Sequence, residues 1–131
     1  MNSVSDDVKD MLEAESSLGL TFGDNLFVGR EPSQPDNCVV VFDTPGYPPV
    51  VTLGADTPYF YPSIQIFVRN KSYLVASDLI QNIVGLLHNK GPETWNGTVY
   101  CSIVCSTDPA LLDWDASGRV RLVTNFNLQR R

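Results

Sequence analysis

The feature that most limits how this chain can fold is a strand pattern that runs directly into a helix pattern. Side chains over 63–69 alternate between two faces, with isoleucine and valine on one of them, which is the two-residue period of a half-buried strand. Ser72 then caps an amphipathic helix over 73–88, whose broad apolar face can cover a sheet. A strand followed at once by a covering helix predicts a sheet packed against helices.

The rest of the chain predicts a first helix and more strands. Residues 3–18 repeat apolar side chains at helical spacing, with Ser3 as the cap and Gly19 as the stop. Asp108-Pro109 is expected to end a strand, and 110–114 to be a short connecting piece before a tight turn. Further strands are predicted over 26–30, 38–42, 98–106 and 120–128.

These elements predict one domain spanning 1–131. Its class is α+β, with a mixed, mainly antiparallel β-sheet and two helices packed on one face. The length of 131 residues suffices for one hydrophobic core, whereas two separate cores would each be marginal.

A proline-rich stretch over 44–62 is predicted to be a long loop, because it contains five of the nine prolines. Within it, 50–53 has the composition of a short strand. The loop carries aromatic side chains that are candidate protein contacts, since exposed aromatics often anchor interfaces. They could equally cover an open sheet edge. These candidates are Tyr47, Tyr59, Phe60 and Tyr61.

The net charge of −6 is unevenly distributed. Residues 1–60 hold ten acids and two bases, giving −8, and 61–131 hold five acids and seven bases, giving +2. An acidic balance argues against nucleic-acid binding, which needs Lys and Arg to displace counterions. Oppositely biased halves could meet head to tail between identical subunits, or both could face solvent.

Targeting signals are not apparent. The acidic N-terminus has no apolar core of a signal peptide, and no apolar run approaches the ~20 residues of a membrane span. Three cysteines, an odd number, give no disulfide framework. We therefore expect a protein made in the cytoplasm with reduced thiols.

A search for reactive groups predicts no catalytic, cofactor or metal site. The cysteines and the single histidine, His88, lack the close pairing of zinc ligands, because Cys101 and Cys105 would lie ~13 Å apart along a strand. Nothing in the sequence links His88 to a cysteine nucleophile, so it is expected to be an exposed helix-end residue. Paired carboxylates fall on a helix or beside a turn, and Arg130 and Arg131 are expected to be a frayed terminus.

Two stretches carry a family resemblance. Pro62-Ser63-Ile64-Gln65-Ile66 precedes the amphipathic helix, and Asp115-Ala116-Ser117-Gly118-Arg119 is followed by Asn125-Phe126. Together they resemble the phage tail-terminator or minor capsid proteins, in which a "P-x-(I/V)-Q-I" strand precedes a helix and a "D-x-x-GR…NF" hairpin closes the chain. The resemblance covers about residues 60–131, and it implies a lambda tail-terminator-like fold.

The resemblance implies a structural virion protein without catalytic residues. Such a subunit forms a ring, usually a hexamer, that caps the tail tube and meets head-completion or connector proteins, while DNA passes through the lumen. The 44–62 loop would then contact the tube or a neighbouring subunit. The alternatives are another head-tail connector or minor capsid protein of the neck, and a small cytoplasmic module that binds a peptide or ligand.

Overall fold

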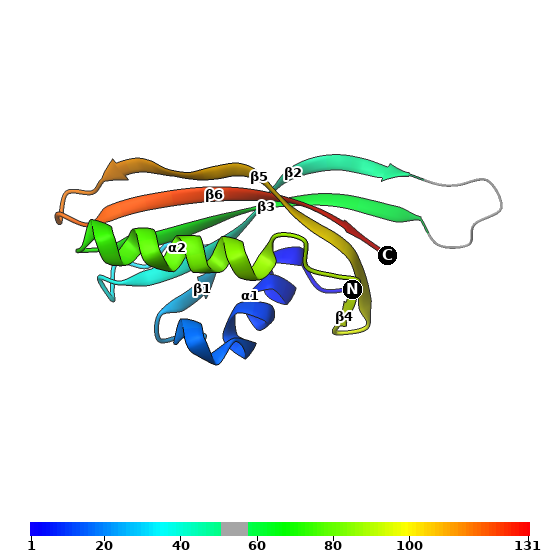
Figure 1. Ribbon diagram of the computed structural model, residues 1–131, viewed down its shortest axis with the longest axis horizontal. Helices are drawn as coiled ribbons and strands as arrows, with labels where there is room; N and C mark the ends of the chain where they lie inside the picture. The colour runs from blue at the N-terminus through cyan, green and yellow to red at the C-terminus, as the bar shows by residue number, and fades with distance from the viewer. Residues whose placement is uncertain (51–57) are drawn as a thin grey trace.

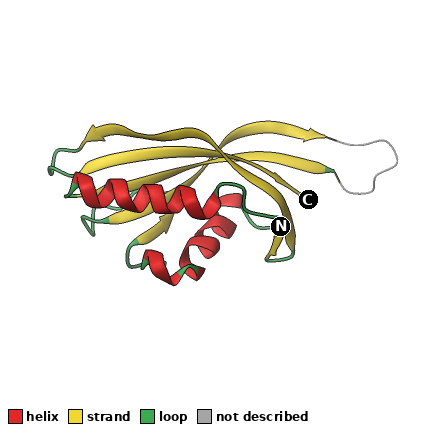
Figure 2. Ribbon diagram, viewed as in Figure 1, coloured by secondary structure: helices red, strands yellow, loops and turns green. Residues whose placement is uncertain are grey.

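The computed structural model describes residues 1–50 and 58–131, and Figures 1 and 2 show a curved sheet with helices beneath it. In chain order the elements are α1 (Val4–Ala14), a 3₁₀ turn η1 (Ser16–Leu18), β1 (Leu26–Val28), β2 (Cys38–Val50), β3 (Tyr59–Asn70), α2 (Tyr73–Leu87), β4 (Glu93–Trp95), β5 (Thr98–Trp114) and β6 (Val120–Arg130).

The described strands form one six-stranded sheet in the order β1-β2-β3-β6-β5-β4. β1 pairs with β2 in parallel, and the other neighbours are antiparallel. The predicted mixed, mainly antiparallel α+β fold is therefore confirmed.

Both helices cover the same face of the sheet, as Figure 2 shows. The predicted caps are present: Ser3 Oγ accepts from the Asp6 amide at 3.3 Å, and Ser72 Oγ accepts from the Val75 amide at 3.4 Å. None of the described helices is both long and apolar enough to span a bilayer.

The core lies between the helices and the covered face of the sheet. The alternation predicted for β3 is confirmed, because Ile64, Ile66 and Val68 are fully buried against the helices. Cys38 to Val41 is buried at four successive positions, so side chains on both faces of this part of β2 are shielded from solvent. Other core side chains are Val8, Leu12, Leu26, Ile80, Ile83, Leu87, Tyr100, Ile103, Val120 and Phe126.

Several predicted boundaries were wrong. The 44–62 loop is largely sheet, because β2 continues to Val50 and β3 begins at Tyr59; 51–53 of the predicted short strand lies outside the described residues. Asp108-Pro109 does not end β5, which continues to Trp114 through bulges. The first helix ends at Ala14, followed by η1 and the left-handed Gly19.

The C-terminus is not frayed. Arg130 lies in β6, and the backbone of Arg131 exchanges two 3.0 Å hydrogen bonds with Val99. The short strand β4 was not predicted; it pairs with the start of β5.

Candidate interaction surfaces

The outer parts of β2 and β3 form an arm, defined here as Thr44–Val50 and Tyr59–Ser63, and β6 still pairs with its β3 strand at Phe60 and Ser63. The arm projects beyond the helices on the right of Figure 1. Its strands pair at Thr44 with Ser63, Tyr47 with Tyr61 and Val50 with Tyr59, with register shifts between these pairs. β1 pairs with β2 only as far as Val41, so within the described residues the arm strand of β2 has a free outer edge.

The base of the arm is anchored to the first helix. The Asp43 carboxylate accepts hydrogen bonds from the amide and the hydroxyl of Ser5, at 3.0 and 2.7 Å, in the first turn of α1. A negative charge at a helix N-terminus is favourable, because the amides there are unpaired and the helix dipole is positive. Further out, Gly46 lies directly against the backbone of β3, where an added Cβ would be 2.8 Å from Cα of Pro62.

The predicted contact residues occupy this arm but differ in exposure. Tyr47 is 76% exposed, whereas Tyr59, Phe60 and Tyr61 are half-buried. The Tyr59 hydroxyl accepts from Arg131 at 3.2 Å, and the same guanidinium lies 5.6 Å from the ring centre. Tyr47 is therefore the candidate most available to a partner, while Tyr59 is engaged with the C-terminus.

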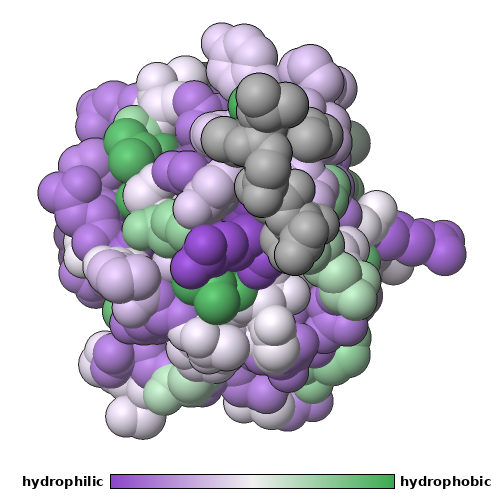
Figure 3. Space-filling view, turned by 90° about the vertical axis from the view of Figure 1, so that its right-hand side faces the viewer, coloured by the Kyte–Doolittle hydropathy of each residue, from purple (hydrophilic) through white to green (hydrophobic). Residues whose placement is uncertain are grey.

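Seen from the arm end, the described side chains that border the grey segment are a mixture of deep purple, pale and green groups (Figure 3). The described arm residues include no Asp, Glu, Lys or Arg; they are Thr44, Pro45, Gly46, Tyr47, Pro48, Pro49, Val50, Tyr59, Phe60, Tyr61, Pro62 and Ser63. An uncharged, proline-rich projection of this kind gains little from facing water and suits contact with another protein.

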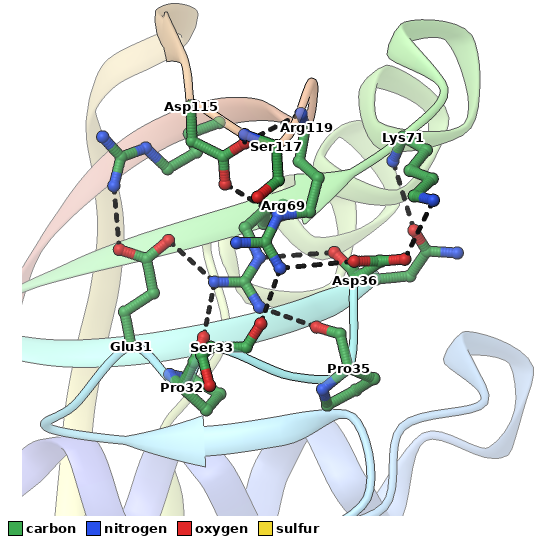
Figure 4. Close-up of polar contacts among 12 residues, drawn as sticks. Glu31, Pro32, Ser33, Pro35, Asp36, Arg69, Lys71, Asp115, Ser117 and Arg119 are labelled. Atoms are coloured by element: carbon green, nitrogen blue, oxygen red, sulfur yellow. Dashed lines mark hydrogen bonds and ion pairs between the residues drawn. The ribbon is translucent and has the colours of Figure 1, made fainter.

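The opposite end of the sheet carries a dense polar cluster (Figure 4). Arg69, only 2% exposed, donates to the Glu31 carboxylate at 3.0 Å and to the carbonyls of Pro32 and Pro35 at 2.6 Å each. Arg119 donates to the Ser33 carbonyl at 2.7 Å. These bonds fasten the 31–36 loop onto β3 and the β5–β6 turn.

The remaining charges of the cluster are also paired. Arg121 contacts the Asp113 carboxylate through two hydrogen bonds and Glu31 through a third at 2.9 Å. The hydrogen bonds from Arg121 lower the pKa of Asp113, and that of Asp115 is lowered by the Arg119 amide and then by its side chain. Because each arginine is already engaged by acceptors within the chain, the cluster serves as a structural clamp.

Sequence reasoning missed one buried carboxylate, Asp7, which connects α1 to strand β5. Asp7 is fully buried and accepts hydrogen bonds from the Tyr100 hydroxyl and from Asn96 at 2.7 Å. Burial and this carboxylate raise the pKa of Tyr100. The available signal was that Asp7 falls three positions after Val4, on the apolar stripe of the helix.

The single histidine contacts the backbone of a cysteine. His88 is exposed at the end of α2, as predicted, and its Nδ1 accepts from the Cys105 amide at 3.0 Å. This contact is to backbone rather than sulfur. Burial raises the pKa of the Cys38 thiol, which disfavours the thiolate. Among the described residues, no group of three or more His, Cys, Asp or Glu side chains could hold a metal ion.

A surface hollow of about 590 Å³ lies beside β1 and is bordered by Phe22, Phe27 and Arg30. The described residues that line it include none of the arm aromatics. The arm therefore does not contribute to this hollow.

An exposed apolar patch lies at the end of the sheet away from the arm. We define this end patch as Tyr73, Leu74, Leu111, Leu112 and Trp114, which are 47%, 74%, 51%, 50% and 52% exposed.

Strand register brings the two parts of the end patch together. Trp114 and Asn70 both pair with Val120, so the end of β5 lies level with the start of α2. Leu111 and Trp114 oppose core residues of β6 and thus face the helix side. The sequence had predicted this part of β5 to be a connecting piece, although the adjacent Leu111 and Leu112 beside Trp114 were a readable apolar signal.

Comparison with known proteins identifies relatives of the chain. A family model described as bacteriophage tail terminator protein matches residues 6–131, which is nearly the whole chain. No curated protein sequence matches the chain significantly.

Two solved structures share the fold. A chain from the virion of a native gene transfer agent particle superposes with a TM-score of 0.67 and 11% identity, covering 97% of this chain and 93% of that chain. A second solved protein gives a TM-score of 0.56 and 10% identity, covering 97% and 89%. At these identities the similarity concerns the fold.

Proposed function

Because the chain belongs to the bacteriophage tail terminator family, we propose that it is a structural subunit that forms a ring on the end of the tail tube and joins the tube to the head-neck connector. The observation that carries the proposal is the family match over residues 6–131. The shared fold with a chain of a gene transfer agent virion supports a place in the particle.

In the proposed assembly six copies form the ring, and the protein acts through shape and complementary surfaces rather than catalysis. The common core of helices and sheet supports treating residues 1–131 as one domain. The paired arginines support a structural part for the charged groups.

The lumen of the ring would let DNA pass without binding it. The net charge of −6 supports this part of the proposal, since an acidic wall repels phosphate. Lining residues changed to Lys or Arg should slow DNA ejection, and ejection at an unchanged rate would count against the lumen assignment.

Particles that lack this protein test the assignment as terminator. We expect tails that are overlong or fail to join heads, because nothing would stop tube polymerisation or offer a joining surface. Tails of normal length on heads with empty necks would instead indicate a connector or minor capsid protein of the neck. Electron microscopy and native mass spectrometry of wild-type protein, alone and with tail tubes, test whether rings form.

A further inference from the structure

We propose that the arm of one subunit docks on the end patch of the next, and that this contact closes the ring. The inference rests on the proposed ring function and specifies which surfaces of the two copies meet.

The first argument is the position of the two surfaces. The arm contains the start of β3 and the end patch lies beyond its other end, so eleven residue steps from Tyr59 to Asn70 separate them by about 36 Å. An arm at this distance cannot fold back onto its own patch. Two different surfaces at opposite ends of one subunit make a heterologous contact, which closes into a ring when the rotation between copies allows it.

The second argument is the chemical match. The described arm residues are uncharged, and Tyr47 and Val50 are 76% and 50% exposed. The end patch consists of five large apolar side chains, each about half exposed or more, and Asp113, which lies between two of them in the chain, is already paired with Arg121. Contact between the arm and the end patch would remove apolar surface from water without leaving a charged group buried and unpaired.

The third argument is size. Each aromatic side chain can bury about 150–250 Å², so the half-exposed patch offers several hundred Å², close to the largest patches that monomers expose. A standard interface buries roughly 800 Å² per partner. The patch is thus suited to be the apolar centre of a larger contact, with aromatic anchors where binding energy concentrates.

A complementation experiment tests this contact directly. Leu112→Lys damages the patch and leaves the arm intact, whereas Tyr47→Lys damages the arm and leaves the patch intact. Both side chains are exposed, so each variant should fold, which thermal unfolding will verify. Each variant alone should need at least about 30-fold more protein than wild type to form rings, as expected for loss of an interface hot spot.

Mixing the two variants separates this mechanism from others. The intact arm of L112K can bind the intact patch of Y47K, but the remaining arm and patch are both damaged, so native mass spectrometry should find a 1:1 heterodimer that does not grow. Cysteines at the same two positions, on separate molecules, should form a disulfide on mixing with an added mild oxidant, which accepts the two electrons and two protons of the thiols. Asn82→Lys, and Asn82→Cys with Tyr47→Cys, are controls on the exposed side of α2 and should behave as wild type in assembly and give no specific cross-link.

The possible failures are distinguishable. If wild type forms rings but each variant also does so normally, or the mixture yields no heterodimer, the docking assignment is wrong and the ring proposal stands. If L112K forms rings but no longer binds tail tubes, the patch contacts the tube instead. If wild type forms no rings, either free or on tail tubes, both proposals fail.

Discussion

The bond between Tyr100 and Asp7 gives a stability prediction whose sign and size follow from the geometry. Asp7 is fully buried, and the Tyr100 hydroxyl donates to its Oδ2, while Asn96 and Asn2 donate to Oδ1. Tyr100→Phe keeps the ring in the core but leaves Oδ2 without its donor. A hydrogen bond to a charged group contributes about 1.5–3 kcal/mol, so the free energy of unfolding at neutral pH should fall by this amount.

The destabilisation caused by Tyr100→Phe should decrease at alkaline pH. Burial, and next the bond to Asp7, raise the pKa of Tyr100 above the ordinary tyrosine value of 10.0. The folded state therefore keeps the phenol proton after the unfolded chain has released it, and the stabilisation present below pH 10 is lost as pH rises. The loss approaches about 1.4 kcal/mol per pH unit for one group.

Urea unfolding of both proteins from about pH 7 to about pH 11.5 measures the effect. Titration of all other groups is common to wild type and variant, so it cancels in their difference. The difference should be largest near neutrality and shrink above pH 10. Tyr73→Phe, at a 47% exposed position, is the matched control and should change stability by less than about 0.5 kcal/mol. A difference that stays constant over the whole pH range would refute the reasoning.

Three further substitutions have defined outcomes, each measured by denaturant unfolding. Gly46→Ala places a Cβ against the backbone at Pro62 and should destabilise by about 1–3 kcal/mol, as overpacking does, unless the arm strands separate and leave the core stability unchanged. Gly85→Ala, in α2 with no atom within 4 Å of the new Cβ, should stabilise by about 0.5–1 kcal/mol; a loss would mean the helix is strained there. Arg69→Leu leaves the carbonyls of Pro32 and Pro35 and one oxygen of Glu31 without their donor, while Arg121 still holds the other oxygen, and should cost about 3–5 kcal/mol; a cost below about 1 kcal/mol would contradict the clamp.

Local periodicity was sufficient to predict the centre of the fold. The alternation in β3, the stripe of α2 and the caps at Ser3 and Ser72 are local signals, and each matches what the structure contains. Strand order across the sheet depends on contacts between distant residues, and the sequence gives no comparable signal for them. β4 was missed because three residues, Glu93–Trp95, are too few to show a period.

The interaction surfaces were only partly predictable. Tyr47 and its aromatic neighbours were identified by composition, but their placement on a paired arm depends on the register of β2 and β3. The end patch combines the start of α2 with the end of β5, about forty positions apart in the chain, and becomes visible once β6 aligns them. The clamp around Arg69 likewise joins three separate segments.

The prolines that led to the wrong prediction of a loop also bear on how the arm makes contact. A proline has no amide hydrogen, so it is tolerated in a strand where that side of the strand has no neighbour. Pro45, Pro48 and Pro49 lie beyond Val41, the last residue of β2 that pairs with β1. Among the described residues, this part of β2 pairs with β3 alone. Because neighbouring amides of a strand point to opposite edges, one of the two adjacent prolines, Pro48 or Pro49, interrupts the row of donors that another strand would need, which limits uncontrolled edge-to-edge pairing. Pro109 and the bulges of β5 act in the same way beside the end patch.

If both surfaces are closed to strand addition, subunits must join through side chains such as Tyr47 and Trp114. Such a contact has a fixed geometry and can end in a closed ring, whereas continued strand pairing would propagate into open polymers.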